Sequence, residues 1–92
     1  MKSIVQNDPS SCYECGRYGA LDTHHIFRGP YRKAADMDGL TVKLCRSCHE
    51  HVHKYPKGEM NVNLRKDGQR RWMKYYGGSV EDFRKRYGRS VL

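Results

Sequence analysis

Long apolar runs are missing from this 92-residue chain, of which only 37% is apolar and 30% is charged. No stretch approaches the roughly 18 consecutive apolar residues of a membrane-spanning helix, so we exclude one. The first residues also lack the apolar run of a secretory signal, and we therefore expect a cytoplasmic protein in which paired disulfides are rare. A single domain this small and polar usually needs a metal ion or a disulfide to stabilise it.

Cysteine and histidine are both absent after position 53. All four cysteines and all five histidines lie between positions 12 and 53. Acidic residues are scarce in the remaining part: residues 54–92 contain eleven basic and four acidic side chains, a net charge of +7, against +1 for residues 1–53. A basic surplus of this kind predicts a polyanionic partner, with nucleic acid as the first candidate.

The residue pattern of the first half predicts two short strands. Residues 1–11 lack periodicity and are expected to form a flexible arm. Residues 20–27 and 40–44 have the pattern of half-buried strands, and the segment 28–39 between them has the breakers and turn residues of a loop. We therefore expect the two strands to pair as a hairpin.

The second half is expected to be helical. Helices are predicted over residues 46–55 and 63–76, each followed by glycine or proline. The helix at 63–76 should bury one face, formed by Leu64, Gly68, Trp72 and Tyr76. A last helix should begin after Ser79, because Ser79 and Asp82 have the spacing of a capping box.

The cysteines form two CxxC pairs, Cys12 with Cys15 and Cys45 with Cys48. Two intervening residues let both sulfurs of a pair bind one ion, and four thiolates complete the tetrahedral shell that Zn²⁺ prefers. A redox motif would need only one pair and a βαβ setting. We therefore predict a structural Zn²⁺ whose binding supplies folding free energy.

The histidines predict a second metal site. His49 and His53 are four residues apart on an expected helix, so their side chains lie on one face and can chelate a divalent ion, whereas His51 points elsewhere. His24 and His25 fall on the first expected strand. Because neighbouring strand residues face opposite sides, both can serve one site only if the strand ends or bends there.

These residue types favour hydrolysis of a phosphodiester. A neutral imidazole can take a proton from water, and a divalent ion can polarise a phosphoryl oxygen. The basic half would hold the polyanion through its phosphates rather than its bases. The expected DNA contacts lie off the apolar face of the helix at 63–76: Arg65, Lys66, Arg70 and Lys74.

The order of these motifs resembles the HNH endonucleases. The similarity covers residues 12–55, from Cys12 through His24-His25-Ile26 to Cys48-His49 and His53, and it implies a ββα-metal, treble-clef-like core with an added four-cysteine zinc site. Residues 56–92 resemble the basic helical extension of short phage-encoded members. The resemblance therefore implies a single nuclease domain at 12–92, acting in the host cytoplasm if phage-encoded, with packaging or recombination partners unknown.

The resemblance also assigns roles to individual residues. His25 matches the general base of the family, and His24, His49 and His53 match ligands of the catalytic ion, which could be Mg²⁺, Mn²⁺, Ni²⁺ or Zn²⁺. DNA is the implied substrate. One position departs from the family: Leu40 stands where a central asparagine orients the base, and a backbone carbonyl or Asp38 is the expected substitute.

Two other functions fit part of the sequence. A non-catalytic treble-clef-like zinc module that binds DNA or RNA would use the cysteines and the basic half, but it has no need of the paired histidines. A zinc domain that binds other proteins would explain the cysteines and leave the +7 charge of residues 54–92 without a role.

Overall fold

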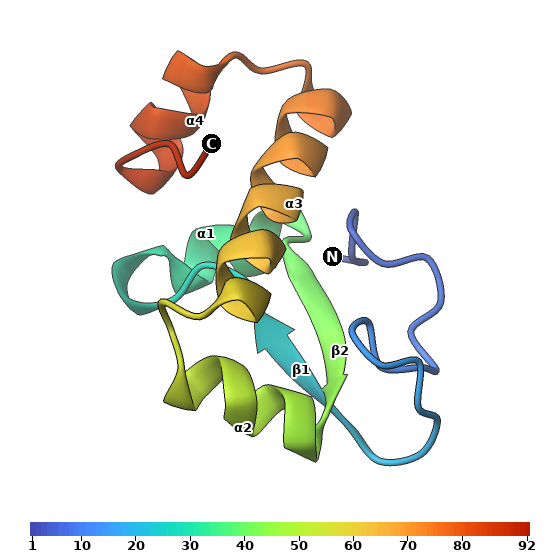
Figure 1. Cartoon of the computed structure of the whole chain (residues 1–92). Helices are drawn as coiled ribbons and strands as arrows, with labels where there is room; N and C mark the ends of the chain where they lie inside the picture. Colours follow the sequence, from blue (N-terminus) through green and yellow to red (C-terminus); the bar gives the residue numbers. More distant parts are fainter.

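The computed structural model describes residues 1–92, which form a small α+β fold with one two-stranded sheet and four α-helices (Figure 1). β1 (Leu21–His25) and β2 (Thr41–Cys45) pair antiparallel, with Leu21 opposite Cys45 and His25 opposite Thr41. Three helices follow: α2 (Arg46–Lys54), α3 (Glu59–Tyr76) and α4 (Val80–Tyr87). The α+β class and the two C-terminal helices confirm the sequence prediction. No helix has the length and apolar content that crossing a bilayer requires.

The connection between the strands differs from the loop that we predicted at 28–39. It contains a 3-10 turn at Gly29–Tyr31 and then α1 (Arg32–Asp38). Gly39 ends α1 with a φ of 79°, a left-handed conformation that glycine adopts without strain. A Cβ at this position would also lie 2.5 Å from the carbonyl oxygen of Lys2. The turn residues that suggested a loop are therefore the end of a helix.

Helix α3 begins at Glu59, four residues before the predicted start, and follows Gly58 directly. Its inner face buries Leu64, Gly68 and Trp72 as predicted, whereas Tyr76 remains 42% exposed. A Cβ at Gly68 would lie only 3.1 Å from Ile26. Glycine at this position therefore lets α3 approach the segment that follows β1.

Residues 1–11 form no helix and no named strand, in line with the lack of periodicity, but they pack against the domain. The Ile4 amide donates to the carbonyl of Gly39 at 2.9 Å. The side chain of Gln6 accepts from the amide of Lys43 on β2 at 2.7 Å. Val5 is buried in the core. The segment is thus attached along the edge of β2 rather than separate from the fold.

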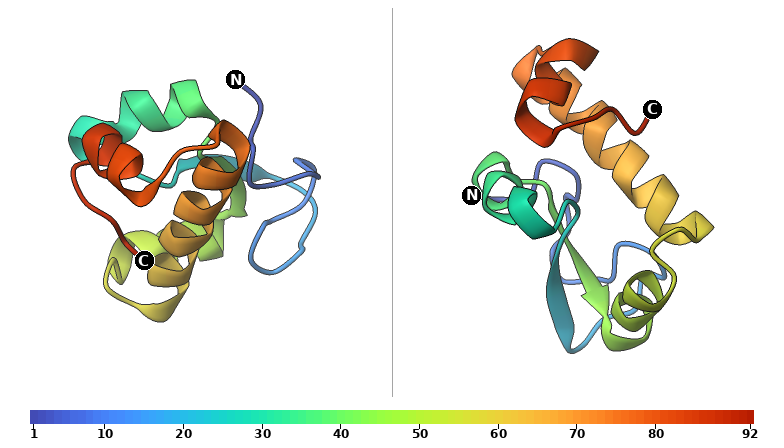
Figure 2. Two further views of the ribbon diagram at one scale, coloured as in Figure 1. Left: turned by 90° about the horizontal axis from the view of Figure 1, so that it is seen from above. Right: turned by 90° about the vertical axis from the view of Figure 1, so that its left-hand side faces the viewer.

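Helix α4 folds back over α1, as the two views of Figure 2 show. The contact centres on Asp38, at the end of α1, whose carboxylate is buried. Trp72 Nε1 donates to it at 2.9 Å and the Tyr87 hydroxyl at 2.8 Å. Arg86 adds two charged hydrogen bonds at 2.7 and 2.8 Å. Although burial raises the pKa of Asp38, these bonds outweigh it and hold the pKa below its usual value.

We predict that Asp38→Asn destabilises the protein by about 3 kcal/mol, because it removes the anion from Arg86 and from the buried donors of Trp72 and Tyr87. A loss of this size lowers the Tm of a domain this small by roughly 10 °C or more. The carboxylate contributes fully above its unfolded pKa of about 3.9, and the contribution disappears as the pH falls through the lower folded-state value. Thermal unfolding at neutral pH measures the effect.

Asp36→Asn is the matched control, because it removes the same charge from the same helix at a side chain that is 65% exposed. It should cost less than about 1 kcal/mol. Equal melting temperatures for the two variants would show that Asp38 does not anchor α4 to α1.

Candidate metal centres and catalytic residues

The four cysteines meet at one end of the sheet, where their sulfurs lie within 4.8 Å of one another. Cys45 caps α2 by accepting the amide of Cys48, so both residues are fixed by the start of that helix. Cys12 and Cys15 lie in a tight turn closed by the Gly16 amide, which donates to the carbonyl of Cys12 at 2.9 Å. The neighbouring Tyr13 amide donates to Lys43 on β2 and holds this turn against the sheet.

The donor set fits a tetrahedral Zn²⁺. Four sulfurs at about 2.3 Å from one zinc lie roughly 3.8 Å apart, and Cys15 Sγ and Cys45 Sγ are 3.7 Å apart here. All four cysteines are free thiols. Burial opposes ionisation of Cys12, but surrounding backbone amides lower its pKa to about 6. Burial and the neighbouring sulfurs raise the pKa of Cys48, so four thiolates need a cation at their centre.

Three histidines form a second cluster on the other side of the same elements. His24 of β1 lies opposite His49 and His53 of α2, and their ring nitrogens are within 4.8 Å of one another. The His24 ring meets the other two edge to face, with centroid separations of 5.2 and 5.6 Å. The spacing of four residues along α2 and the antiparallel sheet therefore bring together the three side chains that we predicted as metal ligands.

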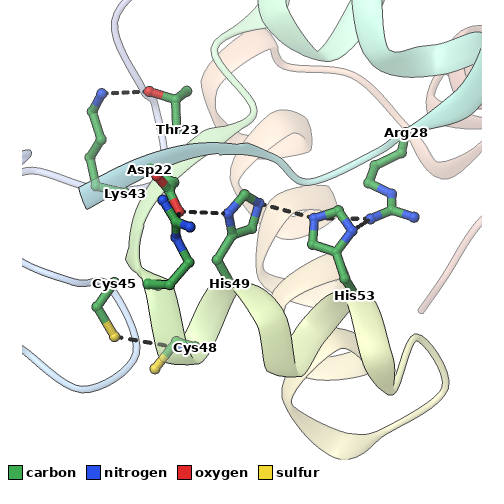
Figure 3. A network of polar contacts seen from close by, with 9 residues as sticks. Asp22, Thr23, Arg28, Lys43, Cys45, Cys48, His49 and His53 are labelled. Carbon is green, nitrogen blue, oxygen red and sulfur yellow. Dashed lines mark hydrogen bonds and ion pairs between the residues drawn. The ribbon is translucent and has the colours of Figure 1, made fainter. Parts of the chain in front are cut away.

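A chain of polar contacts orients this cluster (Figure 3). The His49 Nδ1 atom donates to the Asp22 carboxylate at 3.0 Å, which directs His49 Nε2 toward His53 Nε2, also at 3.0 Å. At the far end, Arg28 Nη1 donates to His53. The hydrogen bond from His49 and the charge of Arg46 lower the pKa of Asp22. A carboxylate behind an imidazole in this way is a common support for a metal-ligating histidine.

His24 supplies the test of whether the cluster fits a metal. Its Nε2 atom is buried and has no hydrogen-bond partner in the protein. Such an orphaned nitrogen is costly unless a ligand completes it. Burial, followed by the charges of His49 and His53, lowers the pKa of His24 to about 4. The imidazole is therefore neutral at pH 7, the form that binds a divalent ion.

His51 lies outside this cluster, as its position on the helix predicted. It is exposed and packs against Tyr55, with ring centroids 4.9 Å apart. Four of the five histidines thus have specific surroundings within the sheet and helices, and His51 serves as a natural comparison on the same helix.

His25 is not part of the three-histidine cluster. It is the last residue of β1 and its side chain lies beside α1, where Nε2 is 3.1 Å from Asp36 Oδ1. A shallow cavity next to it is lined mainly by Arg32, Lys33 and the turn at Gly29. Strand alternation therefore separates His25 from its neighbour His24, as the sequence analysis anticipated for a straight strand.

The group beside His25 is the carboxylate of Asp36, and neither of the two expected substitutes, a backbone carbonyl or Asp38. Asp38 is engaged by Trp72, Arg86 and Tyr87. Leu40, at the position of the central asparagine in the HNH pattern, is fully buried in the core. Its carbonyl accepts the Ile26 amide at 3.0 Å. Asp36, one turn before Leu40, is therefore the side chain available to orient His25.

The four basic residues proposed as DNA contacts do not share one face. Arg65 and Lys74 are nine residues apart, which at about 100° per residue puts them on opposite sides of α3. Arg70 is close to Asp67, at 3.7 Å, and Lys66 and Lys74 have no ion-pair partner. Of the four, Arg65 lines a cavity that Phe27, Arg28 and Arg89 also line.

Sequence reasoning missed three residues of this region: Asp22, Arg28 and Asp36. Asp22 could have been found, because it stands two residues before His24 and therefore on the same face of β1. Arg28 and Asp36 act across the turn and the helix between the strands. Because the sequence predicts a loop there, no helical or strand spacing relates Arg28 and Asp36 to the histidines.

Comparison with protein-family models, with curated proteins and with solved structures finds no significant match.

Proposed function

We propose that this protein is a metal-dependent endonuclease that hydrolyses the phosphodiester bonds of DNA. The observation that carries the proposal is the convergence of His24, His49 and His53 on one point, with a buried nitrogen of His24 left without a partner. His25 follows His24 directly and lies outside the cluster, so it would not be a ligand of the ion and could act as a base. The order of motifs shared with HNH endonucleases supports the same reaction.

His24, His49 and His53 would hold the divalent ion, with Asp22 fixing the ring of His49. When bound, such an ion polarises a phosphoryl oxygen and stabilises the leaving oxygen. The three neutral imidazoles leave the net positive charge of the ion intact, which favours an anionic substrate. Arg28, next to His53, adds a further cation on the same side.

His25 would take the proton from the attacking water. Its Nε2–H donates to Asp36, so Nδ1 carries the lone pair and is the nitrogen that can accept a proton. The water oxygen would then bond to phosphorus as the bond from phosphorus to the leaving oxygen breaks; that oxygen would take up a proton from solvent, and His25 would later return its proton to solvent. Asp36 positions the imidazole and stabilises its protonated form.

The test is a nicking assay with supercoiled plasmid and zinc-loaded protein, repeated with Mg²⁺, Mn²⁺, Ni²⁺ and Zn²⁺. We expect cutting with at least one ion, and we expect His49→Ala to abolish both cutting and binding of the second ion. The loss follows because His49 is a ligand and also the partner of Asp22. Calorimetry with the same ion measures the binding.

His51→Ala is the matched control, since it removes an exposed histidine from the same helix outside the cluster. It should bind the second ion and cut plasmid as the unmodified protein does. If no ion supports cutting, the chain is better described as a zinc module that binds DNA without hydrolysing it.

A further inference from the structure

A cavity of about 520 Å³ lies between the end of α2, the start of α3 and the segment that follows β1. Its size is within the range of pockets that enclose small ligands. The apolar part of its wall includes Phe27, Val52 and Tyr87, all of which are buried. The buried core therefore forms part of the wall of the cavity.

The polar part of the wall is strongly basic. Four cationic side chains line the cavity, and no acidic residue does. None of the four forms an ion pair: Arg28, Lys57, Arg65 and Arg89. By contrast, Arg46, Arg70, Arg84 and Arg86 each have a carboxylate within 4.0 Å. Unpaired cations around one hollow attract an anion.

Arg65 shows how closely these charges are gathered. It is half-buried and lies over the ring of Phe27, with the guanidinium carbon 5.5 Å from the ring centroid. Burial and the charge of Arg89 lower the pKa of Arg65. A guanidinium held against an aromatic ring beside a second cation is pre-positioned for a phosphate, which it can bind through two hydrogen bonds.

Arg28 joins the cavity to the histidine cluster. It lines the cavity and also donates to His53. An anion in the cavity would therefore meet the same arginine that contacts His53 of the cluster. A polymer that carries several phosphates would have one at the histidines and another in the cavity, with Arg28 between them.

We propose that this cavity is a phosphate-binding subsite for the DNA backbone, holding a phosphate next to the one that faces the histidine cluster. Arg65 and Arg89 bind this phosphate, and Arg28 lies between the two positions. The inference rests on the proposed function, which it deepens by giving the path of the strand. It also gives Arg65 a role in phosphate binding that the other basic residues of α3 do not share.

The experiment measures binding of a fluorescently labelled 16-base-pair duplex by anisotropy, with zinc-loaded protein, no added second metal and a series of salt concentrations. Arg65→Met retains the apolar stem over Phe27 and removes the charge. It should weaken binding about tenfold and reduce the slope of log K against log salt by about one. Arg89→Met, at an exposed side chain, should act in the same direction.

Arg84→Met is the matched control, because Arg84 lies on α4 away from the cavity and is paired with Glu81. It should leave affinity and salt slope close to those of the unmodified protein. If all three variants bind alike, the subsite is wrong, even for a protein that cuts plasmid. If Arg65→Met and Arg89→Met weaken binding by a protein that cuts nothing, the subsite stands and the proposed nuclease activity fails.

Discussion

Replacement of His25 by alanine is expected to lower the rate of plasmid cutting by about 10²–10⁴-fold, the usual contribution of a general base. Binding of the second metal should be unchanged, because the side chain of His25 lies beside Asp36 and outside the histidine cluster. This combination of results would distinguish the role of His25 from that of His49, because loss of His49 should remove both metal binding and cutting.

Asp36 provides a second readout of the same step. Asp36→Ala removes the acceptor that holds His25 Nε2, so the rate should fall although the base is still present. Asp36→Asn keeps an oxygen that can accept the same hydrogen bond and should restore part of the rate. A residue with a merely structural role would show no such difference, because the side chain of Asp36 is largely exposed.

Normal cutting by His25→Ala would contradict the assignment of the base. The separation of His25 from the cluster would then be the explanation, and a water molecule near the three histidines would have to lose its proton by another route.

The Cys45→Ser variant is expected to lose the structural zinc and to be largely unfolded at 25 °C. Zinc bound by four cysteines contributes roughly 10–16 kcal/mol in small domains, which equals or exceeds the stability of most domains of this size. Serine is itself a good N-cap residue, so α2 retains its cap and the loss can be attributed to the thiolate. Zinc content and thermal unfolding by circular dichroism measure the two effects.

Ser47→Ala is the matched control, since Ser47 is exposed and lies between Cys45 and Cys48. It should retain zinc and melt at the normal temperature. Full zinc content and an unchanged Tm in Cys45→Ser would exclude the proposed four-cysteine site. Removal of zinc from the unmodified protein with a chelator should reproduce the unfolding.

The strands and the clusters of cysteines and histidines could be predicted from the sequence because these depend on local spacing. CxxC pairs and the four-residue interval from His49 to His53 determine geometry within a turn or a helix, and the structure brings those side chains together. Alternation along β1 indicated that His24 and His25 could face one site only if the strand ended or bent there, and the structure places their side chains apart. The prediction of a loop over residues 28–39 was wrong, because the segment from Asp36 to Gly39 has a composition typical of a turn and also of the end of a helix.

The partners of the site residues could not be predicted, since they depend on how the elements pack. Nothing in the sequence indicates that Asp36 rather than Asp38 meets His25, because both lie on α1 and only the position of α4 reserves Asp38 for Arg86. The surroundings of the basic residues of α3 could not be predicted for the same reason. Helical periodicity places Arg65 off the apolar face, but it does not tell which neighbours surround it.

The buried carboxylate of Asp38 also has a consequence for the order in which the chain can fold during synthesis. Its side-chain partners lie 34, 48 and 49 positions later in the sequence. When α1 and the strands have left the ribosome, this anion therefore has no cation or donor and cannot be buried at low cost. The contact between α1 and α4 therefore forms only after residue 87 has emerged, whereas all four cysteines are present in the chain once Cys48 has emerged.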